Sequence, residues 1–227
     1  MSTYTYKSYN LSDRFVLIPP LLNLKDKKLK YTDALVYAAL KSYSQDSPGL
    51  EHYFDAKKNL NKLGCYPSYT TIAKKAGVAR GTAIEAIKRL EKAKLIEITR
   101  SGKLKASNHY WFPWEETTFT VPFGLFTADD LTPNEKALLI CIRQFYIGDE
   151  LNCMFTQVVN EISKHLGIGY NTVYTQYNSL VKKEYVIDKT ETYKKDYQRR
   201  VIQLSNKLNW IFKPKVVDYA TIKLEFK

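Results

Sequence analysis

Polar and basic side chains recur at helical spacing between residues 79 and 92 of this 227-residue chain. Ala83, Ile87 and Leu90 would form one buried stripe of a helix, since they stand four and then three positions apart. Several hydrogen-bonding side chains fall outside that stripe: Arg80, Thr82, Lys88 and Arg89. Because guanidinium groups pair bidentately with guanine and basic groups neutralise phosphates, this helix is predicted to present a surface suited to nucleic acid.

A second stretch, residues 170–183, has the same pattern with uncharged side chains. Its inner stripe is Val173, Tyr177 and Leu180, and Tyr174 falls between the two faces. The outer positions hold Tyr170, Asn171, Thr172 and Thr175. Asparagine pairs bidentately with adenine, so this helix is also a candidate for contacting base edges.

Residues that could support catalysis do not converge in the sequence. His52, His109 and His165 stand alone, without a carboxylate or cysteine at ligand spacing. The acidic pairs at 115–116 and 129–130 are adjacent in sequence, whereas metal-dependent nucleases need carboxylates from separate elements. Abundant tyrosine raises the alternative of a nicking enzyme, but such enzymes usually carry a histidine cluster for a metal. We therefore expect no enzyme, no cofactor and no metal site.

The composition favours a polyanionic partner, because the formal net charge is +12. No apolar run reaches the ~20 residues of a membrane-spanning helix, and the first residues lack the hydrophobic region of a signal peptide. We therefore expect a cytoplasmic protein that is not bound to a membrane. Cys65, Cys141 and Cys153 are widely spaced without a CxxC pair, so free thiols are expected.

Local signals predict the helices that would position these side chains. Ser68 is a good N-cap for a helix that ends at Gly77, and the next helix begins near Ala79. An earlier helix is predicted at residues 32–43, with Thr32 as its cap. Two helices joined by a tight turn are thus expected after a first, separate helix.

A β-hairpin is predicted to follow the second of these paired helices. Its strands are residues 95–99 and 108–112, with a turn at Ser101 and Gly102. Basic residues surround its tip: Arg100, Lys103 and Lys105. They could contact a phosphate backbone, and the alternative is a solvated hairpin tip.

Together these elements resemble winged helix-turn-helix proteins, in which a hairpin, the wing, follows the recognition helix. The shared pattern is a hydrophobic residue, a small residue, Arg, any residue, Thr, apolar positions and a closing Leu-Ile. Here it reads Val78, Ala79, Arg80, Gly81, Thr82, Ala83, Ile87, Leu90, Leu95 and Ile96. GntR-type bacterial regulators and phage or plasmid replication initiators share it, and the lead-in Tyr66, Pro67, Ser68 looks most like the initiators. We also expect contacts from the start of the first paired helix: Ser68, Tyr69 and Thr70.

The chain departs from this pattern at two positions. Ala79 stands where a serine often caps the recognition helix, and Lys94 stands where a glycine usually precedes Leu-Ile. The first change removes a side-chain cap, and the second predicts a left-handed backbone at a residue other than glycine. Each is expected to cost about 1 kcal/mol.

The pattern occurs twice. Seven residues stand 90 positions after Ile72, Gly77, Val78, Thr82, Ala83, Leu90 and Ile96, namely Ile162, Gly167, Ile168, Thr172, Val173, Leu180 and Val186. Upstream the difference is 103, as for Ala34 and Ala137. We therefore predict an α+β, mainly α fold of two tandem winged-helix domains, each a three-helix core with a β-hairpin wing. The first would span residues 1–113, with an insertion near 44–66, and the second residues 114–227.

The second predicted hairpin is long and mixes basic with aromatic residues. Its basic side chains are Lys194, Lys195, Arg199 and Arg200. This composition suits nucleic acid, and a solvated loop is the alternative. Residues 1–113 carry a net charge of +11 and residues 114–227 only +1, so the first domain is expected to bind DNA alone and the second weakly.

The sequence therefore predicts sequence-specific binding of double-stranded DNA. The resemblance to initiators implies replication initiation of a plasmid or phage through origin recognition, in the cytoplasm of a bacterial host cell. It also implies replisome or helicase-loading proteins as partners, and a homodimer is compatible with it. Two alternatives stay open, a winged-helix transcriptional regulator and a winged-helix protein–protein interaction module.

Overall fold

The computed structural model describes residues 15–20, 24, 28–46, 53–55, 60–101, 107–113, 118–144, 152–154, 158–193 and 197–210. The first half contains β1 (Phe15–Ile18), α1 (Tyr31–Asp46), β2 (Tyr53–Asp55), β3 (Leu60–Cys65), α2 (Tyr69–Ala76), α3 (Arg80–Lys92), β4 (Glu97–Thr99) and β5 (His109–Phe112). The second half contains β6 (Phe119–Pro122), α4 (Gly124–Thr127), α5 (Pro133–Arg143), β7 (Asn152–Met154), α6 (Val158–Leu166), α7 (Tyr170–Lys182), β8 (Val186–Tyr193) and β9 (Tyr197–Leu204).

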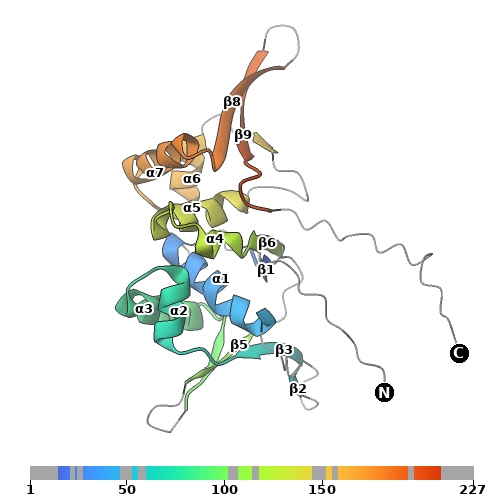
Figure 1. Ribbon diagram of the computed structural model, residues 1–227, viewed down its shortest axis with the longest axis vertical. Helices are drawn as coiled ribbons and strands as arrows, with labels where there is room; N and C mark the ends of the chain where they lie inside the picture. The colour runs from blue at the N-terminus through green and yellow to red at the C-terminus, as the bar shows by residue number, and fades with distance from the viewer. Residues whose placement is uncertain are drawn as a thin grey trace, which may run out of the picture.

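The fold is mixed α+β with small antiparallel sheets, as predicted, and the order of its elements repeats. In each half a helix and a strand are followed by two helices and a β-hairpin (Figure 1). The hairpin strands β4 and β5 belong to a four-stranded sheet in the order β2-β3-β5-β4. Their counterparts β8 and β9 belong to a three-stranded sheet in the order β7-β9-β8.

The predicted insertion near residues 44–66 stays a prediction, because the structure describes only part of that stretch. β3, at its end, pairs with β5 just as β7 pairs with β9, so both halves have this strand. Within the described part of the predicted insertion, β2 is the element without a counterpart. The sequence did not reveal β3, because its partner lies more than forty residues later and LNKLGC does not alternate cleanly.

The paired helices form where their local signals predict. The Ser68 hydroxyl accepts a hydrogen bond from the Thr71 backbone N–H at 3.1 Å, and α2 ends at Gly77 with φ of 68°. Ala79 provides no side-chain cap to α3. Lys94 has φ of 59°, which confirms the left-handed backbone expected of it, and Glu184 has φ of 60° after α7.

The first helix differs from its prediction. α1 begins at Tyr31 and Thr32 lies inside it, so Thr32 is not the cap. Instead the Asp33 carboxylate accepts a hydrogen bond from the Lys30 backbone N–H at 2.9 Å. Residues 33–42 of α1 are all buried, because other elements cover the helix on every side.

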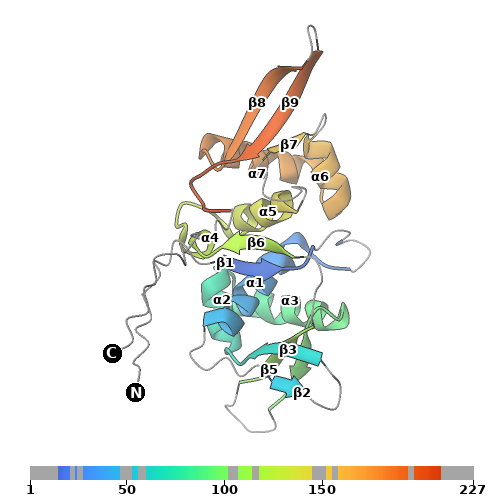
Figure 2. The same ribbon diagram turned by 90° about the vertical axis from the view of Figure 1, so that its right-hand side faces the viewer.

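α1 is covered on every side because the two halves share one core. α1 packs against α2 and α3 of its own half and against α5 of the other. The two halves are also joined by β1, which pairs antiparallel with β6, with Val16 opposite Val121 and Ile18 opposite Phe119. Figure 2 shows these two strands side by side between the halves. The predicted boundary at residues 113–114 stays a prediction, since residues 114–117 lie outside the described part.

The hydrogen bonds also correct the alignment of the first helices. The Thr132 backbone N–H donates to the Glu135 carboxylate at 2.7 Å, as Lys30 does to Asp33. Asp33 and Glu135 are therefore equivalent, and they are 102 positions apart rather than 103. The same offset aligns two buried cations, Lys41 and Arg143. In the described ranges no helix has both the length and the apolar character needed to span a membrane.

Candidate nucleic-acid interface

The exposed face of α3 carries the first predicted contact surface. Ala83, Ile87 and Leu90 are buried in the core, and Ala86 joins them. Arg80, Thr82 and Lys88 are exposed on the opposite face. No hydrogen bond or ion pair holds the Arg80 guanidinium among the described residues. Because Ala79 leaves the first backbone N–H groups of α3 without a side-chain acceptor, Arg80 stands beside a helix start that favours anions.

Glu85 offsets one of the predicted basic contacts. Its carboxylate accepts a hydrogen bond from Lys88 Nζ at 2.8 Å, and both side chains are exposed. That hydrogen bond and the charge of Lys88 lower the pKa of Glu85. The pair compensates Lys88, whereas Arg80 at the start of α3 and Lys92 at its end are exposed cations without such a carboxylate partner among the described residues.

Arg89 has a structural partner that the sequence did not reveal. Its Nε and Nη2 atoms donate to the two Asp33 carboxylate oxygens at 2.7 and 2.8 Å. Asp33 is fully buried, so this bidentate pair fastens α3 to the start of α1 and raises the pKa of Arg89. The geometry argues against the predicted phosphate contact of Arg89, because its guanidinium is already engaged inside the protein.

In the second half, the position equivalent to Arg89 also contacts a carboxylate at the start of the first helix. Ser179, which stands 90 positions after Arg89, donates its hydroxyl to Glu135 on α5, and Lys183 Nζ lies 2.9 Å from the same carboxylate. Burial raises the pKa of Glu135, but the hydrogen bonds from Ser179, Lys183 and Thr132 outweigh it and lower the pKa to about 2. In both halves a carboxylate at the start of the first helix therefore fixes the recognition-helix candidate.

At the start of α2 two of the three predicted contacts, Ser68 and Tyr69, have partners within the protein. Ser68 caps α2, and the Tyr69 hydroxyl accepts a hydrogen bond from Asn108 Nδ2 at 2.9 Å, which ties α2 to the returning strand of the hairpin. Thr70 is exposed.

At the hairpin, Arg100 Nη2 lies 2.6 Å from a Glu91 carboxylate oxygen, and this hydrogen bond raises the pKa of Arg100. Lys103 and Lys105 lie outside the described residues.

α7 presents its predicted polar face to solvent. Tyr170, Asn171, Thr172 and Thr175 are all exposed, while the inner stripe is buried. The Thr175 hydroxyl donates to the Asn171 carbonyl oxygen at 2.9 Å, so it is turned back onto the helix. Lys194 and Lys195 lie outside the described residues, as do the side chains of Arg199 and Arg200 in β9.

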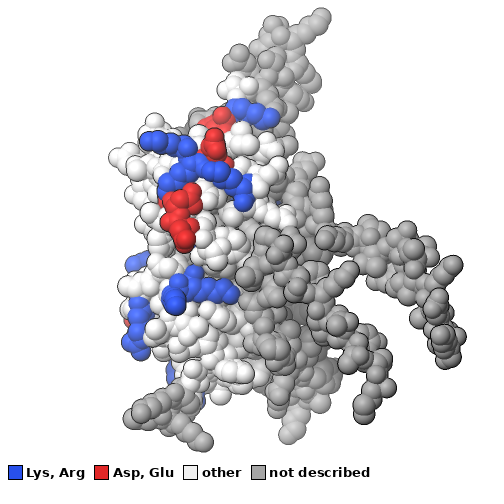
Figure 3. All heavy atoms as spheres, viewed as in Figure 1, with Lys and Arg blue, Asp and Glu red and all other residues white. Residues whose placement is uncertain are grey.

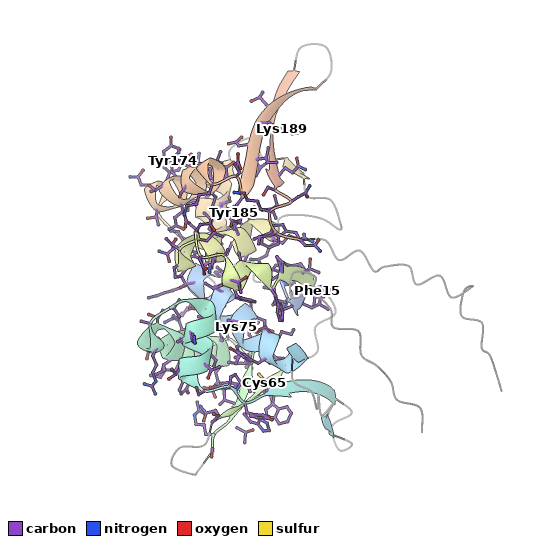
Figure 4. The ribbon with its side chains drawn as sticks, in the orientation of Figure 1. Phe15, Cys65, Lys75, Tyr174, Tyr185 and Lys189 are labelled. Carbon is purple, nitrogen blue, oxygen red and sulfur yellow. The ribbon has the colours of Figure 1, made fainter. Side chains whose placement is uncertain are left out.

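Tyr174 belongs to this face, although the sequence placed it between the two faces. Its ring stacks on that of Tyr170, with centroids 5.7 Å apart and planes 13° from parallel. Both rings are close to half exposed, and Tyr174 points away from the body of the molecule (Figure 4). The spacing of four residues on a helix was the signal that could have identified this pair.

α3 and α7 lie on the same side of the molecule, opposite the β1–β6 pair (Figure 1). On the face drawn in Figure 3 the described charges of the lower half are mostly basic, whereas acidic side chains are interspersed in the upper half. The two exposed helix faces can therefore address one extended partner from one side, and the α3 end is the more basic.

The comparison with known families agrees with this geometry. A family model described as a helix-turn-helix domain matches residues 59–96, which cover β3, α2 and α3. No curated protein matches the chain. The fold and the exposed recognition helix thus define a helix-turn-helix domain. DNA is the partner that such a domain indicates.

Proposed function

We propose that the protein binds double-stranded DNA sequence-specifically, with α3 and α7 in neighbouring major-groove segments. The observation that carries this proposal is the exposed face of α3 within the matched helix-turn-helix domain, where Arg80 has no partner among the described residues. The position of α7 on the same side supports a second contact on the same duplex. Asn171 and Thr172 would contact bases there.

The biological role that we propose is replication initiation of a plasmid or phage through origin recognition. The resemblance of the stretch from Tyr66 to Thr82 to initiators supports it. A transcriptional regulator would use the same helices, and it differs in what the bound site controls. We also propose that the protein binds without catalysing a reaction.

Arg80→Ala tests the DNA-binding proposal. The parent protein is first used to select its preferred sites from a pool of random duplexes, and variants are then titrated with selected and random duplexes. Arg80→Ala should weaken the selected complex by about 1 to 3 kcal/mol and relax preference at one base pair, because a bidentate guanidinium–guanine contact is lost.

Lys92→Ala is the matched control, since it removes the same charge from the exposed end of α3. It should reduce affinity for both duplexes alike and leave the preferred sequence unchanged. Equal binding of selected and random duplexes by the parent protein would refute sequence-specific recognition.

A replication assay separates the two roles. A plasmid that carries this gene with its flanking DNA, but no other origin, should be maintained in a bacterial host and lost when Arg80→Ala is introduced. Binding at a promoter without plasmid maintenance would assign the protein to regulation instead.

A further inference from the structure

Aromatic side chains line the outer face of the first hairpin sheet, the face that is turned away from the helices. Tyr66, immediately after β3, meets His109 on β5 with ring centroids 5.4 Å apart, and His109 meets Trp111 at 4.8 Å. Tyr66 is 67 % exposed. The inner face of the same strands is occupied by buried Cys65, Tyr110 and Phe112. We call the three outer residues, Tyr66, His109 and Trp111, the aromatic row.

The aromatic row is held in place by its surroundings. Trp111 Nε1 donates to Thr99 Oγ1 at 3.2 Å, which fixes one edge of the indole. Gly64 lies under the other edge, and a Cβ atom there would stand 2.7 Å from two indole carbons. Only glycine therefore allows the ring to lie over β3. Because the side chain is already fixed, little of its conformational entropy remains to be lost when a ligand binds.

A hollow of about 460 Å³ opens beside the row, where β4 ends and β5 begins. It is lined by Tyr66, Thr99, Arg100, Ser101, Ser107 and His109. Two aromatic rings thus share the hollow with hydroxyl groups and one guanidinium. Arg100 is hydrogen-bonded to Glu91 of α3. This pair fixes the orientation of the guanidinium and therefore the direction of its other N–H groups.

The fold does not require the aromatic row. In the second half, buried Ile202 of β9 corresponds to Tyr110, because each pairs with a cysteine on the neighbouring strand, β7 or β3. The position of Trp111 is then taken by Gln203, a polar residue of the usual kind on an outer sheet face. Three adjacent aromatic rings on the solvent side of one sheet therefore point to a ligand.

We propose that the hollow and the aromatic row bind an unpaired base of single-stranded DNA. Bases stack on aromatic rings through their faces, and hydroxyl and guanidinium groups pair with their edges. Paired bases inside a duplex cannot reach this surface, so the ligand is a strand that has left the duplex. The site adjoins the helix-turn-helix domain, since Tyr66 lies two residues before the α2 cap and Arg100 contacts α3. This inference rests on the proposed DNA binding and adds a second form of DNA to it.

Binding of labelled oligo-dT by the full chain tests the inference, with the selected duplex titrated in parallel. His109→Ala and Tyr66→Ala should each weaken oligo-dT binding about 5- to 100-fold, the usual effect of losing one stacked base. Both should leave duplex affinity unchanged, because neither residue is part of the α3 or α7 contact surface. His109→Phe retains a ring and should bind oligo-dT as the parent does.

Arg80→Ala gives the opposite result if both proposals hold, because it should weaken duplex binding and leave oligo-dT binding intact. This contrast distinguishes the failure of one proposal from the failure of the other. Oligo-dT affinity that is insensitive to His109→Ala and Tyr66→Ala would overturn the inference. Preferential binding of the matching RNA, or a change of the protein's own oligomeric state in these variants without a change in oligo-dT affinity, would also overturn it.

Discussion

Arg89 shows how one buried carboxylate redirects a basic side chain. Helical periodicity leaves Arg89 outside the apolar stripe of α3, but it carries no information about Asp33, which lies 56 residues earlier. A buried carboxylate without a partner costs several kcal/mol, so Arg89 is held at the start of α1. The exposure of Arg80, in contrast, could be predicted, because it depends on the local pattern alone.

Glu135 has the equivalent place in the second half and predicts a dependence of stability on pH. Its pKa is about 2 in the folded protein against an ordinary 4.5, so its ionised form stabilises the fold above pH 4.5. This stabilisation is lost as the pH falls from there toward 2. Glu135→Gln should lower the free energy of unfolding at pH 7 by up to about 3 kcal/mol, and by much less near pH 2. Urea unfolding at the two pH values measures both numbers.

Glu184→Gln is the control, because Glu184 is an exposed carboxylate 3.7 Å from Lys207. Its substitution should change stability little at either pH. An equal loss for Glu135→Gln at both pH values would show that the charge of Glu135 is not what stabilises the fold.

At the scale of elements, the helix-turn-helix was predictable because its signals are local. The Ser68 cap, the left-handed Gly77 and the apolar stripes of α2 and α3 lie within one short stretch of chain. β3 and the β1–β6 pair were missed for the opposite reason. Their partners are remote in sequence, and a short strand contains no signal that identifies the strand with which it will pair.

The two left-handed residues after α3 and α7 give a prediction at this scale. Lys94 and Glu184 have φ near 60°, where a side chain crowds the backbone and glycine does not. Lys94→Gly and Glu184→Gly should each raise the free energy of unfolding by about 1 kcal/mol, and the double variant by about 2, because the sites are far apart.

Lys92→Gly is the matched comparison, since it removes a lysine two residues earlier within α3. There a glycine should lower stability by about 1 kcal/mol. Chemical denaturation of the four variants measures these changes, and destabilisation by Lys94→Gly would contradict the argument from backbone strain.

At the scale of the whole molecule, the shared core changes how the two halves can be compared. The sequence predicts that residues 1–113 bind DNA alone, and no observation tests this. A cut near Trp114 would separate β1 from β6 and uncover the α5 side of α1, which is buried throughout residues 33–42. Substitutions in the intact chain, in α3 or in α7, are therefore the better comparison of their contributions.

The contacts between the two halves also lead to a prediction about how the protein binds DNA. Because paired strands and packed helices connect the halves, α3 and α7 should keep a fixed separation, unlike domains on a flexible linker. On a selected duplex, α3 and α7 should each protect one segment of DNA, and the two segments should lie roughly one helical turn of ~10 bp apart.

Inserting ~5 bp between the two contacted segments should remove the α7 contribution. Inserting ~10 bp should not restore it, because the two segments then lie on the same face of the duplex again but are farther apart than α3 and α7 can reach. Affinity measurements and footprints on the three duplexes test this, with Asn171→Ala as the reference for a lost α7 contact. Recovery of full affinity at ~10 bp would show that the halves separate on DNA and that the β1–β6 pair opens when the protein binds.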